Sequence, residues 1–176
     1  MSALDSLEKK LDELFVKQLP ALPAGLKKWI VTYLPWINLV IGVLTALAAL
    51  GLWRTAHTVN QWVDYANQLS AAYGGTAKVN DLGPLFWLAL IVIAVEAVLY
   101  IAAFPGTREK KKSGWNLLFY ALLINVAYGF VVMFTDYGSV GSFIGSLIGS
   151  AIGGYFLFQI RSSYSKSAPT RKAKKA

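Results

Sequence analysis

The sequence contains no cysteine and a single histidine, His57, among its 176 residues. The absence of cysteine excludes disulfide bonds, thiolate metal ligands and cysteine nucleophiles. One histidine cannot build a metal site, so we interpret His57 as an ordinary residue at the edge of a hydrophobic segment. Acidic residues are also scarce, because nine Asp and Glu stand against 17 Lys and Arg. We therefore expect no metal, no cofactor and no catalytic site.

Hydrophobic residues, by contrast, make up 56% of the chain. They gather in four segments, each near the roughly 20 residues that a bilayer requires: 30–53, 85–104, 115–134 and 138–160. The sequence therefore predicts an all-α integral membrane protein whose transmembrane domain, residues 29–160, is a four-helix bundle. Only residues 135–137 separate the last two segments, which predicts a tight antiparallel hairpin.

The first 28 residues form a separate, charged region that shows no pattern of a removable signal peptide. Apolar side chains recur at helical spacing on one face of residues 3–19, opposite a charged face: Leu4, Leu7, Leu11, Leu14 and Phe15. This pattern predicts an amphipathic helix, lying on the inner membrane surface or, as the alternative, forming a coiled-coil seam with a partner. A second short helix, over 59–69, is expected to lie on the outer surface.

Lysine and arginine counts predict the orientation, because these residues favour the cytoplasmic side. Five lie in residues 1–28, four in the loop after the second segment and six in the tail 161–176, against two elsewhere. Both chain ends are therefore expected in the cytoplasm, with the tail basic and disordered. Aromatic residues that we place at the inner boundary are Trp29, Trp36, Trp115 and Tyr164; those at the outer boundary are Trp53, Trp87 and Tyr137.

Four glycines recur every four residues in the last segment: Gly141, Gly145, Gly149 and Gly153. We call them the glycine row. In water each glycine costs a helix about 1 kcal/mol relative to alanine, whereas in lipid the segment must still be helical. The row then forms a flat face on which another backbone packs closely. We interpret it first as a packing face within the chain; a homo-oligomer interface and a pore-lining face are the alternatives.

Glu96 lies in the middle of the second segment, where a charged residue costs roughly 2.5–3.5 kcal/mol on insertion scales. The surrounding apolar residues outweigh that cost, but the carboxyl group should be protonated or paired. All four segments place a polar group near this depth, which predicts an intramembrane polar layer: Thr45, Glu96, Tyr100, Asn125, Ser146 and Ser150. In it Glu96 bonds to Asn125, with Thr45 or a serine as further candidates. The layer either fixes the helix register or forms a proton- or cation-binding site.

The loop after the second segment is basic, and it carries Arg108, Lys110, Lys111 and Lys112. Its GTREKKKS stretch resembles a phosphate-binding loop only superficially, since Lys111 stands where the second glycine belongs and no strand precedes it. We expect these residues to hold anionic lipid headgroups, or merely to set the topology. Nucleic acid is not expected as a partner.

The absence of a nucleophile–base pair argues against an enzyme. Our leading hypothesis is a non-enzymatic accessory, assembly or oligomeric scaffold subunit of the cytoplasmic membrane. It would act through the glycine row on a second copy or on another membrane protein. The alternative hypothesis is a small channel or proton-coupled transporter that uses Glu96.

Overall fold

The computed structural model describes residues 3–75, 82–135 and 138–164, and the regular elements in these ranges are all helices. The short helix α1 (Ala3–Asp12) continues into a π-helical segment, η1 (Glu13–Gln18). Four long helices follow: α2 (Ala24–Ala72), α3 (Pro84–Arg108), α4 (Lys112–Met133) and α5 (Val140–Gln159). A 3₁₀ turn, η2 (Arg161–Ser163), ends the described chain, so the predicted disordered tail lies mostly outside the described residues.

The all-α prediction is confirmed, and the four long helices are each long and apolar enough to cross a membrane. Local signals explain where they begin. Pro23 caps α2 and Pro84 opens α3, positions at which the missing N–H of proline costs nothing. At the start of α5 the Ser142 N–H donates to Ser139 Oγ at 3.1 Å, and the Ser139 N–H donates to Ser142 Oγ at 2.9 Å. This reciprocal pair is a capping box.

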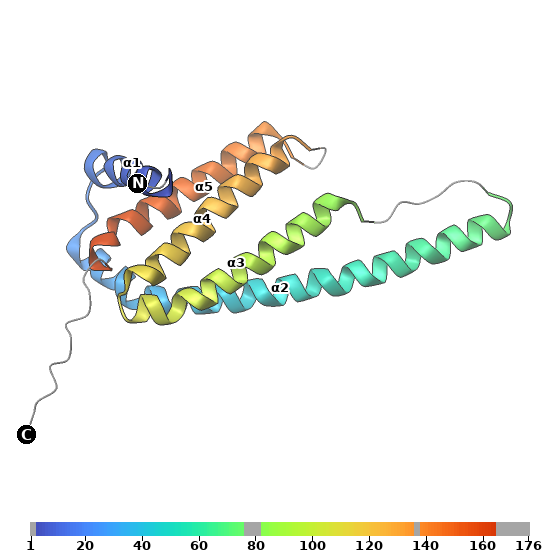
Figure 1. The fold of residues 1–176 in the computed structure, drawn as a ribbon, viewed down its shortest axis with the longest axis horizontal. Coiled ribbons are helices and arrows are strands. Elements are labelled where there is room, and N and C mark those ends of the chain that lie inside the picture. Colours follow the sequence, from blue (N-terminus) through green and yellow to red (C-terminus); the bar gives the residue numbers. More distant parts are fainter. Residues whose placement is uncertain (1–2, 76–81, 136–137, 165–176) are drawn as a thin grey trace, which may run out of the picture.

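The predicted surface helix over 59–69 does not exist as a separate element, because α2 runs unbroken through it. No proline or glycine interrupts residues 54–58. The hydroxyls of Thr55 and Thr58 donate to carbonyls of the same helix four residues earlier. Trp53 contacts Trp87 in the first turn of α3, and the rest of α2 projects past the other helices (Figure 1). One continuous helix cannot both cross a membrane here and lie on its surface, so that prediction is wrong.

The second predicted segment also ends later than expected, since Pro105 and Gly106 lie inside α3 rather than after it. Proline removes one backbone donor but does not prevent the next residues from staying helical. Thr107 supports this last turn by donating its hydroxyl to the Ala103 carbonyl at 2.8 Å. The chain then reverses at Lys110, whose φ of 56° is left-handed.

The long helices pack in chain order, α2 on α3, α3 on α4 and α4 on α5. Figure 1 shows the pair α2/α3 and the pair α4/α5 meeting at the α3–α4 turn and separating toward the opposite end. At the turn, the backbones of Gly106 and Gly114 are so close that a methyl group on either would lie within 2.6 Å of the other. At the opposite end a cavity of about 440 Å³ lies between Pro84 of α3 and Val132 of α4. The bundle is therefore open rather than closed.

The hydrophobic core sits at the end of the molecule where the α3–α4 turn lies. It joins the N-terminal segment to four helices: Phe15, Val31, Ala103, Trp115, Leu118, Phe119, Leu157, Phe158, Ile160 and Tyr164. Trp115 is 0% exposed and Tyr164 is 1% exposed. Both were predicted at the inner membrane boundary; their side chains pack in the core, and their depth in a membrane stays a prediction. Trp29 and Trp36, which were also predicted at the inner boundary, lie on the surface of the molecule and are each 54% exposed.

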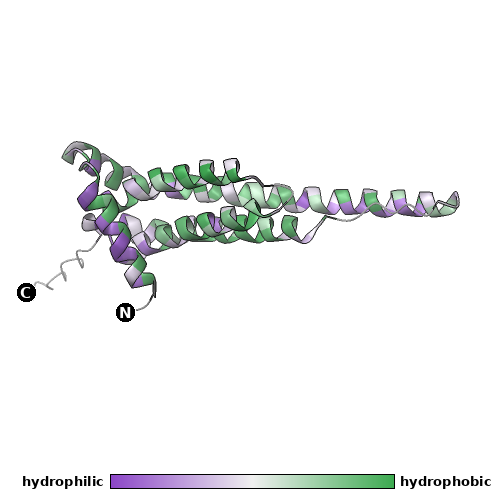
Figure 2. Cartoon of the chain, turned by 90° about the horizontal axis from the view of Figure 1, so that it is seen from above, coloured by the Kyte–Doolittle hydropathy of each residue, from purple (hydrophilic) through white to green (hydrophobic). Residues whose placement is uncertain are grey.

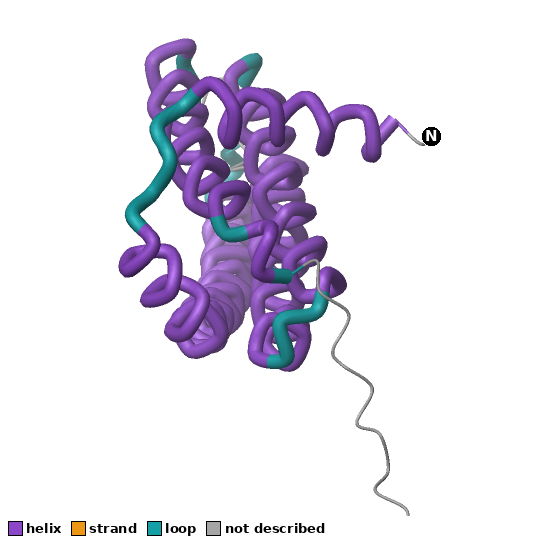
Figure 3. Tube along the Cα trace, turned by 90° about the vertical axis from the view of Figure 1, so that its left-hand side faces the viewer, coloured by secondary structure: helices purple, strands orange, loops and turns teal. Residues whose placement is uncertain are grey.

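The first and last described residues lie at this same end, together with the α3–α4 turn (Figure 1). Figure 2 shows hydrophilic residues concentrated there and hydrophobic residues along the middle of the long helices. Figure 3 shows α1 running across the bundle rather than along it. Most of the apolar face of α1–η1 stays uncovered, since Leu4, Leu7 and Leu14 are 37–47% exposed.

Candidate functional site

A short chain of polar side chains links α3, α4 and α5 midway along their length. The Asn125 amide Nδ2 donates to Glu96 Oε1 at 3.4 Å, and Ser150 Oγ donates to Asn125 Oδ1 at 3.3 Å. The Asn125 side chain thus donates to α3 through Nδ2 and accepts from α5 through Oδ1. The structure therefore brings together three of the six residues of the predicted polar layer.

The other three residues of that layer do not join this chain. Thr45 Oγ1 donates to the Ile41 carbonyl of its own helix at 2.8 Å. Ser146 packs against Gly129 of α4, with its Oγ 3.2 Å from where a methyl group on that glycine would lie. Tyr100 lies one turn from Glu96 and lines a separate cavity between the helices. The sequence grouped these residues because each lies near the middle of its hydrophobic segment. Position along a helix does not determine the direction in which a side chain points.

The glycine row has almost no neighbours within the chain. A methyl group on Gly145 or Gly149 would meet no atom within 4 Å, and one on Gly153 would only touch Leu122 of α4 at 3.8 Å. The neighbouring face of α5 packs on α4 instead, through Ser146 and Ser150. Our first interpretation, packing within the chain, is therefore wrong for Gly145 and Gly149. The row lies exposed on the molecule.

Close glycine packing occurs elsewhere. A methyl group on Gly42 of α2 would lie 2.8 Å from Ile101 and 3.0 Å from Tyr100, both on α3. One on Gly129 of α4 would lie 3.6 Å from Phe143 of α5. Together with Gly106 and Gly114, these glycines mark where the long helices approach each other. Gly42 of α2 and Gly129 of α4 therefore pack within the chain, but not against the glycine row.

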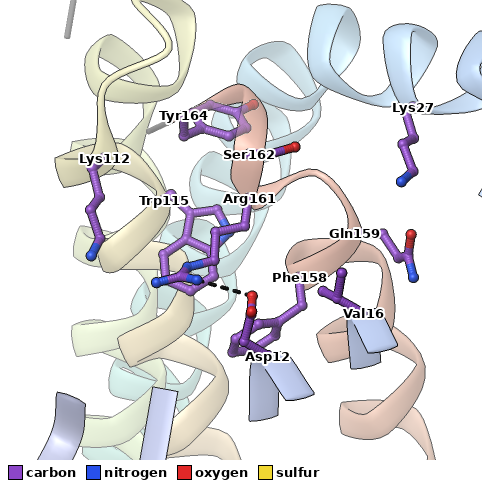
Figure 4. A pocket seen from close by; sticks show the side chains of 10 residues that line it. All are labelled: Asp12, Val16, Lys27, Lys112, Trp115, Phe158, Gln159, Arg161, Ser162 and Tyr164. Atoms are coloured by element: carbon purple, nitrogen blue, oxygen red, sulfur yellow. Dashed lines mark hydrogen bonds and ion pairs between the residues drawn. The ribbon is translucent and has the colours of Figure 1, made fainter. Parts of the chain in front are cut away.

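An ion-pair network fastens the N-terminal helix to the end of α5. Arg161 Nη1 donates to Asp12 Oδ1 at 3.0 Å, and Arg161 Nη2 pairs with Glu8. Lys112 Nζ lies 3.2 Å from the same Glu8 oxygen. The Arg161 guanidinium also lies over the ring of Trp115, 5.5 Å from its centroid (Figure 4). Charge-assisted hydrogen bonds in a partly buried place are stronger than those on an open surface.

Hydrogen bonds reinforce this attachment. The Gln159 amide is 2% exposed and donates Nε2 to the Phe15 carbonyl at 2.8 Å. Its Oε1 accepts from the Leu22 N–H at 3.2 Å. The Tyr155 hydroxyl donates to the Pro20 carbonyl at 2.7 Å. Residues 15–22 are therefore held against α5 mainly through their backbone.

The cavity in Figure 4 has a volume of about 340 Å³ and lies among these groups. Lys27, Lys112 and Arg161 line it together with Asp12. Two of its three cations are already paired with acids of α1, so its charge is largely balanced. Tyr164 also lines it, with a buried hydroxyl that has no hydrogen-bond partner among the described residues. Burial raises the pKa of Tyr164 to about 12.

Two of the four cations of the basic loop form ion pairs within the chain, so fewer of them are free to bind lipid headgroups than the sequence suggests. Lys111 pairs with Glu109, and the hydrogen bond to Lys111 holds the pKa of the Glu109 carboxyl below its usual range. Lys112 pairs with Glu8 of α1. Within the described ranges, Arg108 and Lys110 form no ion pair and are exposed. The His57 ring lies against the ring of Trp53, with a centroid separation of 4.9 Å.

Sequence reasoning missed the network around Gln159 and Arg161. A signal was present, since Gln159 interrupts the apolar run at the end of α5, where a polar side chain needs a partner. In the described part of the chain, no group of three or more His, Asp or Glu could hold a metal ion. No family model, curated protein or solved structure matches this chain.

Proposed function

We propose that the four long helices of this chain are embedded in a membrane, with both chain ends on the cytoplasmic side. The outward faces of the helices support this. Along α2, for example, Val40, Leu44, Leu47 and Leu50 are 57–60% exposed. A helix that is apolar on all sides is stable either in a large core or in lipid, and no such core surrounds these. Among the described residues, most lysines and arginines lie at the end that holds the α3–α4 turn and the first and last described residues.

We further propose that the protein acts by association, as an accessory, assembly or scaffold subunit. The observation that carries this proposal is the exposure of the glycine row. Small residues at successive turns let two helix backbones approach closely in a membrane, and no helix of this chain uses Gly145 or Gly149 in that way. A helix of a second copy or of another membrane protein would use it.

The absence of native cysteine allows a direct test. Single cysteines at Gly145 or Gly149 should form disulfide-linked species in native membranes under mild oxidation. Leu147→Cys is the matched control, because Leu147 is also exposed and the helical repeat of 3.6 residues places it on the side of α5 opposite Gly145 and Gly149. Equal cross-linking at all three positions, or monomer alone in both oxidation and chemical cross-linking experiments, would contradict association through the row.

A second candidate function rests on the chain of Glu96, Asn125 and Ser150, which offers a path for a proton or a site for a cation across three helices. Protein in liposomes should then show a pH-dependent flux that Glu96→Gln abolishes. The amide of Gln can still bond to Asn125. If no flux is measured and Glu96→Gln only shifts the melting temperature, the polar chain is structural.

A further inference from the structure

A cavity of about 460 Å³ lies between the two helix pairs, near the end where the core sits. All four long helices line it, among them Ile37 and Ile41 of α2, Tyr100 of α3, Leu122 of α4 and Gly153 of α5. Its volume falls in the range of small-molecule sites, roughly 300–1,000 Å³. We call it the α2–α5 groove, because α2 and α5 face each other across it without packing along their length.

The groove is open at its side. Ile37 and Ile41 on one wall are 39% and 42% exposed, and Phe156 on the other wall is 37% exposed. In a membrane the molecules beside this opening are lipid chains. An unfilled apolar groove there would forfeit the dispersion contacts that its walls can make. An apolar occupant is therefore favoured over water.

One polar group in the groove lacks a partner. Asn38 of α2 is 4% exposed, and its Nδ2 has no hydrogen-bond partner in the part of the chain that the structure describes. An unsatisfied buried amide is costly, so it needs an explanation. Since the nearby lining is almost entirely apolar, the missing acceptor is best supplied by a molecule that enters the groove.

The depth of Asn38 indicates which acceptor that is. The rings of Trp36 and Phe104 are in contact, with centroids 5.3 Å apart, which sets α2 level with α3. At 1.5 Å per residue, Asn38 then lies about 9 Å deeper than Arg108. A headgroup region is roughly 5–8 Å thick on each side of the hydrocarbon. With Arg108 among the headgroups, Asn38 falls where acyl esters join the hydrocarbon.

A positive charge near the cytoplasmic end of the α2–α5 groove favours a phospholipid as its occupant. Lys27 lies three residues before Ile30, which lines the groove, so both are on the same face of α2. None of the ion pairs among the described residues involves Lys27. A cation at the headgroup level attracts an anionic lipid.

We propose that the α2–α5 groove binds one acyl chain of an anionic phospholipid of the inner leaflet. Asn38 Nδ2 donates to the ester carbonyl of that chain, and the chain extends past Ile41 and Gly153. This proposal rests on the membrane insertion proposed above but not on association through the glycine row.

The test uses the full chain in vesicles of phosphatidylcholine and phosphatidylglycerol. A small fraction of the phosphatidylglycerol carries a photoreactive diazirine in its acyl chain. After irradiation, mass spectrometry should locate adducts mainly in residues 34–41, 118–122 and 153–157. Asn38→Leu should lower these adducts about fivefold, the factor that corresponds to about 1 kcal/mol for one hydrogen bond.

Asn60→Leu is the matched control, because Asn60 is another amide of α2 with an unpartnered buried atom but lies away from the groove. It should leave the adducts unchanged. Ile41→Trp, which fills the rim with a ring, should lower them even if Asn38→Leu folds poorly.

Adducts spread evenly over the exposed faces of the helices, or unchanged by both Asn38→Leu and Ile41→Trp, would overturn the groove proposal. So would peptide cross-links that place a helix of a second copy in the groove. A chain that stays soluble without detergent would instead overturn the membrane insertion itself.

Discussion

At the scale of single residues, the environment of each glycine decides its importance, and the repeating pattern does not. A methyl group on Gly114 would lie 2.3 Å from the Thr107 backbone nitrogen and 2.4 Å from the Gly106 carbonyl carbon. Backbone atoms at such distances cannot move aside without separating the helices. Gly51, in the middle of α2, has no atom within 4 Å of that position. Gly114 is therefore a position where a methyl group should destabilise the fold, and Gly51 is its matched control.

We expect Gly114→Ala to destabilise the protein by about 1–3 kcal/mol or more, the range for overpacked sites. Gly51→Ala should be neutral or slightly stabilising, because alanine favours the helix. Thermal unfolding of both variants in the same detergent measures the difference. Equal melting temperatures would contradict the close contact between α3 and α4.

Tyr164 carries a buried hydroxyl without a partner, so its removal should not cost stability. Tyr164→Phe keeps the ring in the core and removes an unsatisfied group whose burial costs about 1–3 kcal/mol. We expect a variant at least as stable as the wild type at pH 7. A clear loss of stability would show that the hydroxyl has a partner.

The pKa of Tyr164 adds a pH dependence. In the unfolded chain the phenol ionises near pH 10, whereas burial raises the pKa in the folded protein to about 12. The contribution of the neutral phenol is thus complete below pH 10 and is lost as pH rises toward 12. The stability difference between wild type and Tyr164→Phe should widen over that interval, as chemical denaturation at each pH would measure. A constant difference would refute the raised pKa.

The pairing of Glu96 with Asn125 could be predicted from the sequence, because two lone polar groups at one depth in apolar helices have few other partners. The direction of the glycine row could not. In a helix that is apolar on all sides, hydrophobic periodicity does not distinguish the face toward a neighbour from the face toward lipid. The hydrogen bond from Ser150 to Asn125 sets the orientation of α5, because it turns the serine face toward α4 and leaves the glycine row facing outward.

At the scale of elements, the segment α1–η1 depends on α5 for its position. Its helix is too short to be stable alone in water, and its contact with the rest of the chain is concentrated at Phe15, Gln159 and Arg161. Phe15 lies against Phe158, with ring centroids 5.6 Å apart. The sequence predicted the helix but not its docking, because pairs such as Glu8 with Arg161 are separated by 153 residues.

Gln159→Leu should release residues 13–22 while leaving the long helices intact, because it removes the amide's hydrogen bonds to Phe15 and Leu22, at 2.8 and 3.2 Å, and a longer one to Pro20, at 3.4 Å. The two shorter bonds, at about 1 kcal/mol each, correspond to a roughly 30-fold rise in the open population. Hydrogen exchange of residues 13–22, or trypsin cleavage after Lys17, measures it. Gln68→Leu, an exposed site on α2, serves as the control. Unchanged protection would show that Phe15 and Arg161 suffice to hold the segment.

The ends of the long helices were predicted less accurately than their existence, and the reason is physical. Hydropathy marks where a helix leaves an apolar region, whereas a helix ends only where its backbone can no longer continue. The segment 30–53 therefore marks an apolar part of α2 rather than the whole helix. Gly74, with a φ of 73°, lies in the turn that follows its end.

At the scale of the whole molecule, the open arrangement of two helix pairs explains why the exposed features lie where they do. The pairs are joined at Gly106 and Gly114 and held by the core at the same end. Because α2 and α5 do not close the bundle, the glycine row and the α2–α5 groove both remain accessible. The sequence predicted a four-helix bundle but not how far its two helix pairs separate. Neither the composition of the sequence nor the spacing of its residues predicts that the two helix pairs separate.

This arrangement predicts the topology. The segment η1, which contains Lys17, and the α3–α4 turn, which contains Lys110, lie at the core end, whereas the part of α2 after Trp53, which contains Asp64, projects beyond the opposite end (Figure 1). Single cysteines at these positions, in a chain without native cysteine, can be labelled with a membrane-impermeant maleimide. In intact cells Asp64→Cys should react, whereas Lys17→Cys and Lys110→Cys should react only after the membrane is opened. The unmodified chain supplies the background. Reaction of Asp64→Cys and Lys110→Cys from the same side would mean that α3 does not cross the membrane, and reaction of Asp64→Cys and Lys17→Cys from the same side would mean the same for α2; either result would remove the basis of the lipid groove as well.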